Sequence, residues 1–323
     1  MSIDGQESKA QHYVPNFYLK GFTDRNGSLW VYEKSQPPRQ SKPKHEAHRP
    51  DYYTHTDTGE RDESIEDLLE KVESQVAPII RKLANPQHVL TPQNSEYVVV
   101  FVSFMFARVP AWREYLNRMA VAVARSIYLK TASDKSKFEQ ICADFEKKTG
   151  EKVGSYEDMR KHILEGNYTF AQESVAFNLG GMMKSACFIM DELAAFDYQV
   201  LYAPTGKSFW TSDSPVYTLR PENRREASIG MGFGWPGVEV YFSLNKRACL
   251  KLKKGQGSGS FLVAEEYVDD INRLTMATAT RHLYASEGLR RTARLFDERG
   301  CRMPPGQGSF MPRPPQQYQY LTR

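Results

Sequence analysis

Apolar residues recur at helical spacing through the middle of the chain, between residues 62 and 193. In the clearest run they stand three and four positions apart after Asp62, which predicts a long amphipathic helix. A second helix, from Thr91 to about Arg108, is apolar on nearly every side, so we expect it to lie at the centre of the protein. Further helices are expected at residues 112–129, 136–148, 156–165 and 170–193.

Segments rich in aromatic and branched residues lie on either side of these helices and predict strands. Before the helices, a short helix after Pro15 is followed by expected strands at residues 28–34 and 51–55. After them, strands are expected at residues 197–203, 208–211, 238–244 and 248–252, and a last helix at residues 267–281. This order predicts an α+β fold, a helix-rich bundle packed with a small, mostly antiparallel sheet formed by N-terminal and C-terminal strands.

The 323 residues are close to the upper limit for a single hydrophobic core. We expect a flexible N-terminus at residues 1–10 and a single mixed helix and strand domain at residues 11–287. A tail rich in proline, glycine and arginine follows at residues 288–323.

The net charge of +4 is small, but two stretches concentrate basic residues. Residues 34–50 hold five lysines and arginines among four prolines, and residues 281–323 hold eight arginines. Solvated loops and tails are the simpler interpretation of both stretches, and contact with phosphate groups is the alternative.

Four cysteines stand far apart, without the spacing of a zinc site or a disulfide framework, so reduced thiols are expected. The N-terminal segment lacks the apolar stretch of a secretory signal. The longest apolar run is shorter than the roughly 20 residues needed to cross a bilayer. These features predict a cytoplasmic protein that does not enter a membrane.

Strong catalytic signatures are missing from the sequence, including the phosphate-binding loop, the HExxH motif and the GxSxG elbow. The cofactor is therefore unknown, no residues form a recognisable metal-site motif, and the sequence leaves open whether a metal is used. His12, at the entry to the first helix, is expected either to cap backbone groups or to act as a general base. A row of glutamates that includes Glu66 could hold a divalent cation, but an exposed acidic helix face explains it more simply.

Two further charged residues stand at unusual places. Arg108 closes an apolar helix, so its guanidinium group must find a carboxylate, a phosphate or carbonyl groups. Asp213 follows a strand and precedes Pro215, where an aspartate either caps its own turn or presents a catalytic carboxylate. The sequence leaves both interpretations of Asp213 open.

Several segments together resemble the domain of unknown function 4238 family over residues 11–285: HYVPNFYLKGF, LWVYEK, ESIEDLLEKVE, FARVP, FWTSDSPVY and YFSLNKRACL. The resemblance implies a stand-alone cytoplasmic protein of bacterial type, with no activity attached. The family's motif positions fall on His12, Tyr13, Pro15, Glu66, Arg108, Ser212, Asp213, Pro215 and Asn272.

This assortment of polar groups favours a hydrolase, most plausibly a nuclease or a nucleotide phosphodiester hydrolase. His12 would shuttle protons, Glu66 and Asp213 would act as bases or metal ligands, and Arg108 would stabilise negative charge. The residues expected to bind the substrate are Tyr13, Ser212 and Asn272. Two alternatives remain. One is a non-catalytic module that binds nucleic acid or a partner. The other is a structural subunit that forms a homo-oligomer through its many aromatic residues.

Overall fold

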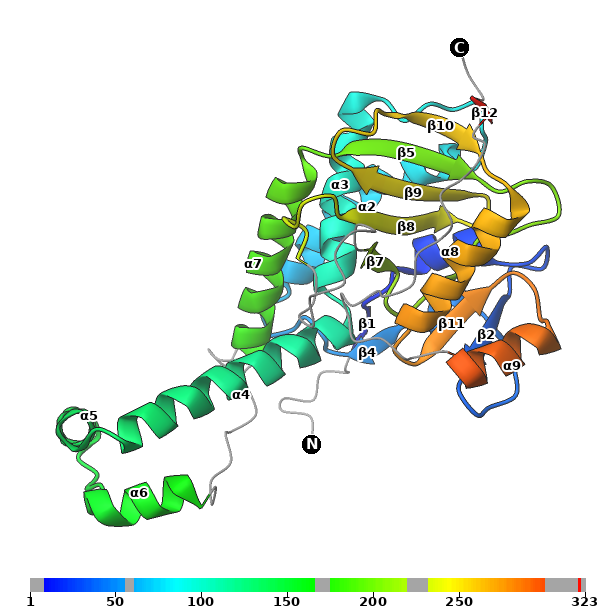
Figure 1. The fold of residues 1–323 in the computed structure, drawn as a ribbon. Coiled ribbons are helices and arrows are strands. Elements are labelled where there is room, and N and C mark those ends of the chain that lie inside the picture. Colours follow the sequence, from blue (N-terminus) through cyan, green and yellow to red (C-terminus); the bar gives the residue numbers. More distant parts are fainter. Residues whose placement is uncertain (1–8, 56–60, 166–174, 220–231, 300–318, 321–323) are drawn as a thin grey trace. The chain divides into compact units, whose positions relative to one another are not determined.

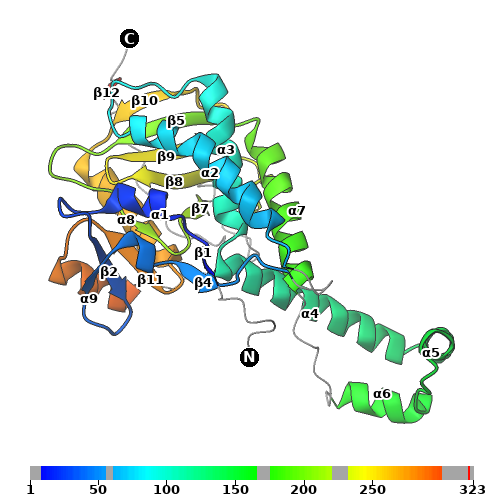
Figure 2. The ribbon, with the colours of Figure 1, turned by 180° about the vertical axis from the view of Figure 1, so that it is seen from behind.

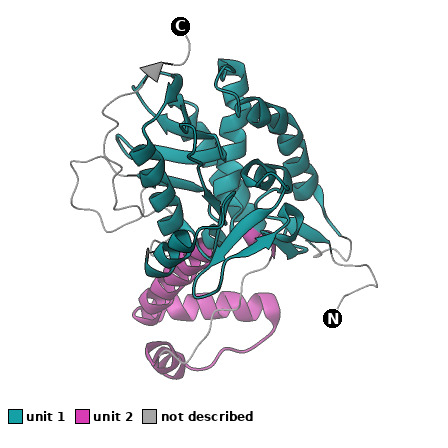
Figure 3. Cartoon of the chain, turned by 90° about the vertical axis from the view of Figure 1, so that its right-hand side faces the viewer, with its two compact units in different colours: residues 1–113, 179–323 teal, residues 114–178 magenta. Residues whose placement is uncertain are grey.

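The computed structural model describes residues 9–55, 61–165, 175–219, 232–299 and 319–320. It divides the chain into two compact units (Figure 3). Unit 1 is formed by Met1–Arg113 with Leu179–Arg323, and unit 2 by Glu114–Asn178. The prediction of one domain over residues 11–287 stays a prediction.

A six-stranded sheet forms the largest layer of unit 1 (Figure 1). Neighbouring strands run antiparallel except β10 and β5, which are parallel. Residues far apart in the second half of the chain thus build one sheet. In spatial order its strands are β12 (Gln319–Tyr320), β10 (Gly259–Leu262), β5 (Asp197–Tyr202), β9 (Ala248–Lys253), β8 (Glu239–Asn245) and β7 (Val216–Leu219).

A four-stranded antiparallel sheet combines strands from the N-terminal and C-terminal parts of the chain. Its strands are β3 (Arg39–Ser41), β2 (Leu29–Glu33), β11 (His282–Ala285) and β6 (Thr211–Ser212). A third sheet pairs β1 (Ala10–His12) with β4 (His48–Pro50). The prediction of a strand at residues 51–55 is wrong, because a turn begins at Asp51, whose φ of 47° breaks the extended conformation.

Helices cover both faces of the six-stranded sheet. α2 (Ser64–Lys82) and α3 (Pro92–Ala107) lie on one face, and α8 (Glu265–Thr278) lies on the other (Figures 1 and 2). Side chains along β8 alternate between the two layers, as a strand buried on both faces requires. Val240 and Phe242 join the α2 and α3 core, whereas Tyr241 packs with the α8 residues Tyr267 and Ile271.

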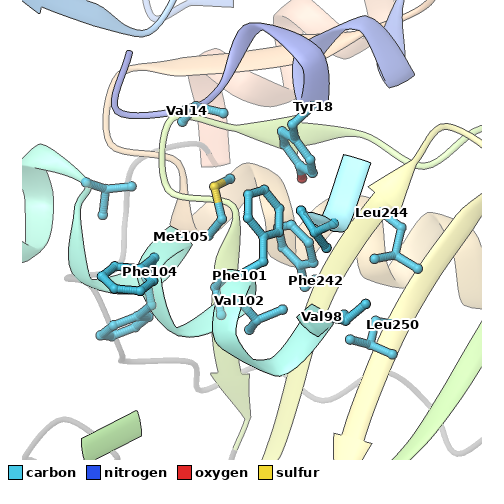
Figure 4. Close-up of a cluster of buried hydrophobic side chains, with 14 of the residues drawn as sticks. Val14, Tyr18, Val98, Phe101, Val102, Phe104, Met105, Phe242, Leu244 and Leu250 are labelled. Carbon is cyan, nitrogen blue, oxygen red and sulfur yellow. The ribbon is translucent and has the colours of Figure 1, made fainter. Parts of the chain in front are cut away.

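The centre of the core is a stack of aromatic rings from three elements (Figure 4). Phe101 of α3 packs on Phe242 of β8 with ring centroids 5.9 Å apart. Tyr18, from α1 (Asn16–Leu19), stacks on the same Phe242 at 5.1 Å and donates a hydrogen bond to the Ser243 carbonyl at 2.6 Å. The expectation that the apolar second helix lies centrally is therefore confirmed.

Short elements complete unit 1. The helix α9 (Arg290–Arg299) begins within the segment predicted as a tail, and it packs on β2 through the buried Phe296. Gly288 precedes it, and a Cβ atom there would stand 2.4 Å from the Trp30 ring, so only glycine fits. Residues 300–318 and 321–323 lie outside the described residues. The remaining elements are the 3₁₀ helices η1 (Lys20–Phe22) and η2 (Pro43–His45), and α7 (Val175–Leu193), which reaches unit 1 at Leu179.

The described part of unit 2 consists of helices and the short loops between them. It contains α4 (Pro110–Ala132) from residue 114 onward, α5 (Lys135–Thr149) and α6 (Tyr156–Leu164). Asp134 and Ser155 cap the N-termini of α5 and α6 by accepting backbone amide hydrogen bonds. A small apolar cluster of Ala132, Phe138 and Ile163 holds the three helices together.

The α+β class is confirmed, and the sheets are mostly antiparallel. The predicted helix bundle with one small sheet is matched only loosely, because the six-stranded sheet is larger than the sequence suggested. Three of its strands were not predicted, because they are short: β7, β10 and β12. Within the described residues, no helix is long and apolar enough to span a bilayer.

Candidate functional site

Two histidines face each other across the two-stranded sheet. β1 and β4 run antiparallel with His12 directly opposite His48, and the ring centroids are 5.4 Å apart. The Tyr13 amide donates to the Ala47 carbonyl at 2.9 Å, which extends the pairing beyond the strands. Both rings are half-buried. The sequence therefore brings together two imidazoles from residues that are far apart along the chain.

Each of these rings keeps a nitrogen atom without a protein partner. Nε2 of His12 and Nδ1 of His48 are withdrawn from solvent and accept or donate no hydrogen bond in the described part of the chain. Burial lowers the pKa of His12, and the neighbouring His48 lowers it further, against a backbone hydrogen bond at Lys44 that raises it. His12 is therefore held in its neutral form, which is the form a general base requires.

Arg108, at the C-terminal end of α3, lies near enough to His12 to act on it electrostatically. Its guanidinium group is almost fully buried and donates to Glu73 Oε1 at 2.8 Å and to the Met105 sulfur at 2.8 Å. It also lies 5.8 Å from the centroid of the Phe101 ring. The anion that the sequence required for Arg108 is thus a carboxylate of α2, and the positive charge lowers the pKa of His12.

Asp213 is held at the edge of the four-stranded sheet, just after β6. Its carboxylate accepts hydrogen bonds from the backbone amides of Thr280 at 2.8 Å, Arg281 at 2.8 Å and His282 at 3.1 Å. Burial raises the pKa of the Asp213 carboxyl, and these three amides oppose that rise. The carboxylate joins the turn before β11 to β6, in the manner of a structural clamp.

Ser212 and Asn272 make local contacts beside this clamp. The Ser212 hydroxyl accepts from the Ser214 amide at 3.1 Å within the turn. Asn272, on α8, accepts from the Trp210 amide at 2.9 Å and donates to the Ser208 carbonyl at 2.9 Å. Both hydrogen-bonding groups of the Asn272 side chain are therefore used to fix the segment before β6 to α8.

A family model described as a protein of unknown function, DUF4238, matches residues 10–288. The chain belongs to this family. Searches of curated proteins and of solved structures gave no match. The DUF4238 resemblance of the sequence motifs is thus confirmed, over most of the chain.

Glu66, which the family resemblance singled out, supports β1 from the side of α2. It accepts a hydrogen bond from the Gln11 side chain, which also donates to the Thr54 hydroxyl at 3.0 Å and accepts from the Tyr53 amide at 2.6 Å. Burial raises the pKa of the Glu66 carboxyl. Gln11 precedes His12, so this network fixes the strand that carries the histidine.

Tyr13 shares a buried polar cluster with the clamp. Burial raises the pKa of Tyr13 far above its ordinary value, and the charge of Asp213 adds to this effect. The Tyr284 hydroxyl lies near both groups, is fully buried, and has no hydrogen-bond partner among the described residues. The motif residues Tyr13 and Asp213 therefore lie close to each other.

The residues that the family resemblance singled out consequently fall into two neighbourhoods. His12 lies with Arg108, and Tyr13 lies with Asp213, while no hydrogen bond or ion pair joins His12 to Asp213 within the described residues. Across the described ranges, no group of three histidines, cysteines, aspartates or glutamates is arranged to hold a metal ion. The catalytic and binding roles predicted for these residues stay predictions.

Sequence reasoning missed His48, which is the residue that gives His12 a partner. It stands within the basic, proline-rich stretch of residues 34–50, which was expected to be a loop. The only signal in the sequence is that a histidine occurs there at all. Three-residue strands such as β1 and β4 show no usable periodicity, so their pairing was not predicted.

We expect Glu73→Gln to destabilise the protein by about 3 kcal/mol, because it leaves the buried Arg108 charge without its counter-ion. Arg108→Met combined with Glu73→Gln should recover much of this loss, since an apolar side chain of similar length then fills the space. Urea denaturation followed by circular dichroism measures both. Glu70→Gln on the exposed side of α2 is the matched control, and an equal loss there would contradict the explanation.

Proposed function

We propose that this protein is a phosphodiester hydrolase that acts on a nucleic acid or nucleotide, with His12 and His48 as its proton-transferring pair. One observation carries the proposal: two facing imidazoles each keep a buried nitrogen atom without a protein partner. Buried polar atoms are nearly always hydrogen-bonded, so an exception calls for a ligand or a water molecule. An imidazole is also the side chain best suited to proton transfer near neutral pH.

The basic character of the surroundings supports a polyanionic substrate. Lys44 and Arg49 are exposed on either side of His48 in the sequence. The second basic stretch begins beside the first one, because α9 packs on β2 and the Ser35 amide donates to Asp297 at 2.7 Å. Exposed arginines of α9 thus lie close to the beginning of the first basic stretch, at Ser35. Such clusters bind phosphate groups and release counter-ions.

The other predicted residues have supporting roles. Arg108 is almost fully buried and its charge is paired with Glu73, so we assign stabilisation of the phosphate charge to the exposed Lys44 and Arg49. The contacts of Asp213 are those of a clamp. We also expect the protein to lie in the cytoplasm.

The test is an assay of the purified full-length chain on end-labelled RNA, DNA and a cyclic dinucleotide. The double variant His12→Gln/His48→Gln, purified in parallel, controls for contaminating nucleases. We expect product from the wild-type protein alone. The absence of product from every substrate would overturn the proposal. If the chain then bound RNA or DNA with an affinity that falls steeply with added salt, the non-catalytic binding module would replace it.

A further inference from the structure

Exposed apolar side chains are concentrated in unit 2, which Figure 3 shows in magenta. Of the 16 large apolar side chains that are exposed within the described residues, 11 lie in this unit, although it holds only about a fifth of the chain. Scattered exposed apolar residues are normal, whereas a concentration of them marks an interaction surface. The eleven are Met119, Val121, Val123, Ile127, Tyr128, Leu129, Ile141, Phe145, Leu164, Val175 and Phe177.

The helix α4 contributes most of this surface, and it is apolar on all sides after Arg118. A helix of that kind is normally enclosed by its neighbours. The apolar cluster that holds unit 2 together takes from α4 only its last residue, Ala132, so most of the helix stays exposed. Three sides of α4, about 120° apart, carry exposed pairs: Met119 with Leu129, Val121 with Tyr128, and Val123 with Ile127.

The charge of unit 2 favours a second copy of the chain as the partner. Residues 114–178 contain ten lysines and arginines and ten aspartates and glutamates, so the unit has no net charge. Surfaces that bind nucleic acids or anionic lipids carry an excess of cations instead. The charge is also divided within the unit, since residues 114–132 of α4 carry +2 and residues 133–178 carry −2. The α4 part of one copy therefore attracts the remaining part of another.

The exposed apolar area is also large enough for a stable dimer. Eleven side chains that are about half exposed present an area on the order of 800 Å². The largest apolar patch of a typical monomeric protein measures about 300–600 Å². A standard protein–protein interface buries about 800 Å² of each partner. In a two-fold dimer the same patch is buried on both chains, so a second copy covers this surface without any other protein.

We propose that unit 2 is a dimerisation surface, in which α4 of one chain packs against α5 and α6 of a second copy. By the two-fold symmetry, the α5 and α6 helices of the first chain receive α4 of the second. The two α4 helices then lie at the centre of a helical bundle built by both chains, where their apolar sides are enclosed. The inference is independent of the proposed function, because it uses no residue of the His12–His48 pair.

Sedimentation of the full-length chain in the analytical ultracentrifuge tests the proposal. Samples reach about 100 µM, because interfaces of this size dissociate at micromolar concentrations or below. We expect the wild-type chain to sediment with twice the mass of one chain. The double variant Val123→Glu/Ile127→Glu should raise the dissociation constant by about 100-fold or more, because it puts two charges into the interface. Both side chains are more than half exposed in the single chain, so the variant should fold.

Val89→Glu is the matched control, because Val89 is equally exposed but lies in unit 1, and this variant should dimerise like the wild type. Hydrogen exchange of the wild-type chain, followed by mass spectrometry, gives a second measurement that does not depend on a variant. Amides of α4 should exchange more slowly at high protein concentration than at low concentration. If circular dichroism shows that the double variant is unfolded, this measurement decides.

Four outcomes would overturn the proposal. A wild-type chain that stays monomeric at every concentration has no such interface, and a dimer that persists unchanged in the folded double variant is formed elsewhere. Protection of α4 that does not depend on concentration would mean that the chain covers this helix itself. A monomer that binds phosphatidylglycerol vesicles or RNA, and loses this binding in the double variant, would assign the surface to a membrane or a nucleic acid.

Discussion

Replacing His12 by glutamine is expected to slow phosphodiester cleavage by about 10² to 10⁴-fold, the usual contribution of a positioned acid or base. His48→Gln should cause a loss of similar size, because each ring performs one of the two proton transfers. Glutamine keeps much of the size and polarity of the ring, so the two-stranded sheet should remain paired. Single-turnover rates at saturating substrate measure the effect on the chemical step alone.

His45→Gln is the matched control, since this exposed histidine lies in η2, only three residues from His48. It should cleave at the wild-type rate. The double variant should be about as slow as either single variant, because groups that act as a unit are not additive. If His12→Gln cleaves at the wild-type rate, His12 is not the base.

The pH dependence follows from the same contacts. Burial and the neighbouring His48 lower the pKa of His12, so His12 remains neutral to a lower pH than a free imidazole does. Its protonated form is inactive as a base. The acid limb of kcat/KM should therefore lie below about 6.5, the ordinary imidazole value. An acid limb above that value would assign the base to another group.

Local patterns allowed much of the architecture to be predicted from the sequence. The amphipathic run after Asp62 became α2, and the apolar run that ends near Arg108 became the central helix α3. These predictions succeed because a long helix repeats its signal over several turns. The sequence predicted a small sheet of N-terminal and C-terminal strands. It did not predict that β2 pairs with β11, since pairing between the two ends of the chain leaves no local pattern.

The candidate site was less predictable, because its geometry depends on long-range contacts. The sequence showed that Arg108 needs an anion, but the choice of Glu73 depends on how α2 packs on α3. It left the role of Asp213 open, and the answer depends on the backbone amides of residues 280–282, which are contributed by another segment. Similarly, His12 was noticed and His48 was not, since their facing arrangement exists only after β1 pairs with β4.

Asp213→Ala is expected to destabilise the folded protein by about 3–5 kcal/mol, because three backbone amides lose their acceptor together and each unsatisfied buried donor costs about 1–3 kcal/mol. Asp213→Asn should lose less, since its side-chain oxygen still accepts from part of the turn. Urea denaturation followed by circular dichroism measures both free energies. The pairing of β6 with β11 should also weaken in Asp213→Ala, because the clamp lies where these strands meet.

Asp269→Ala is the matched control for the clamp, because this aspartate pairs with Lys207 at an exposed position, where an ion pair contributes about 0–1 kcal/mol. If Asp213→Ala lowers the free energy of unfolding by no more than this amount, the amides have found other partners. Asp213→Asn also distinguishes a clamp from a catalytic carboxylate. If Asp213 acts only as a clamp, the cleavage rate per folded molecule stays close to that of the wild type. If a folded Asp213→Asn protein cleaves the substrate about 10²-fold more slowly, Asp213 takes part in the reaction itself.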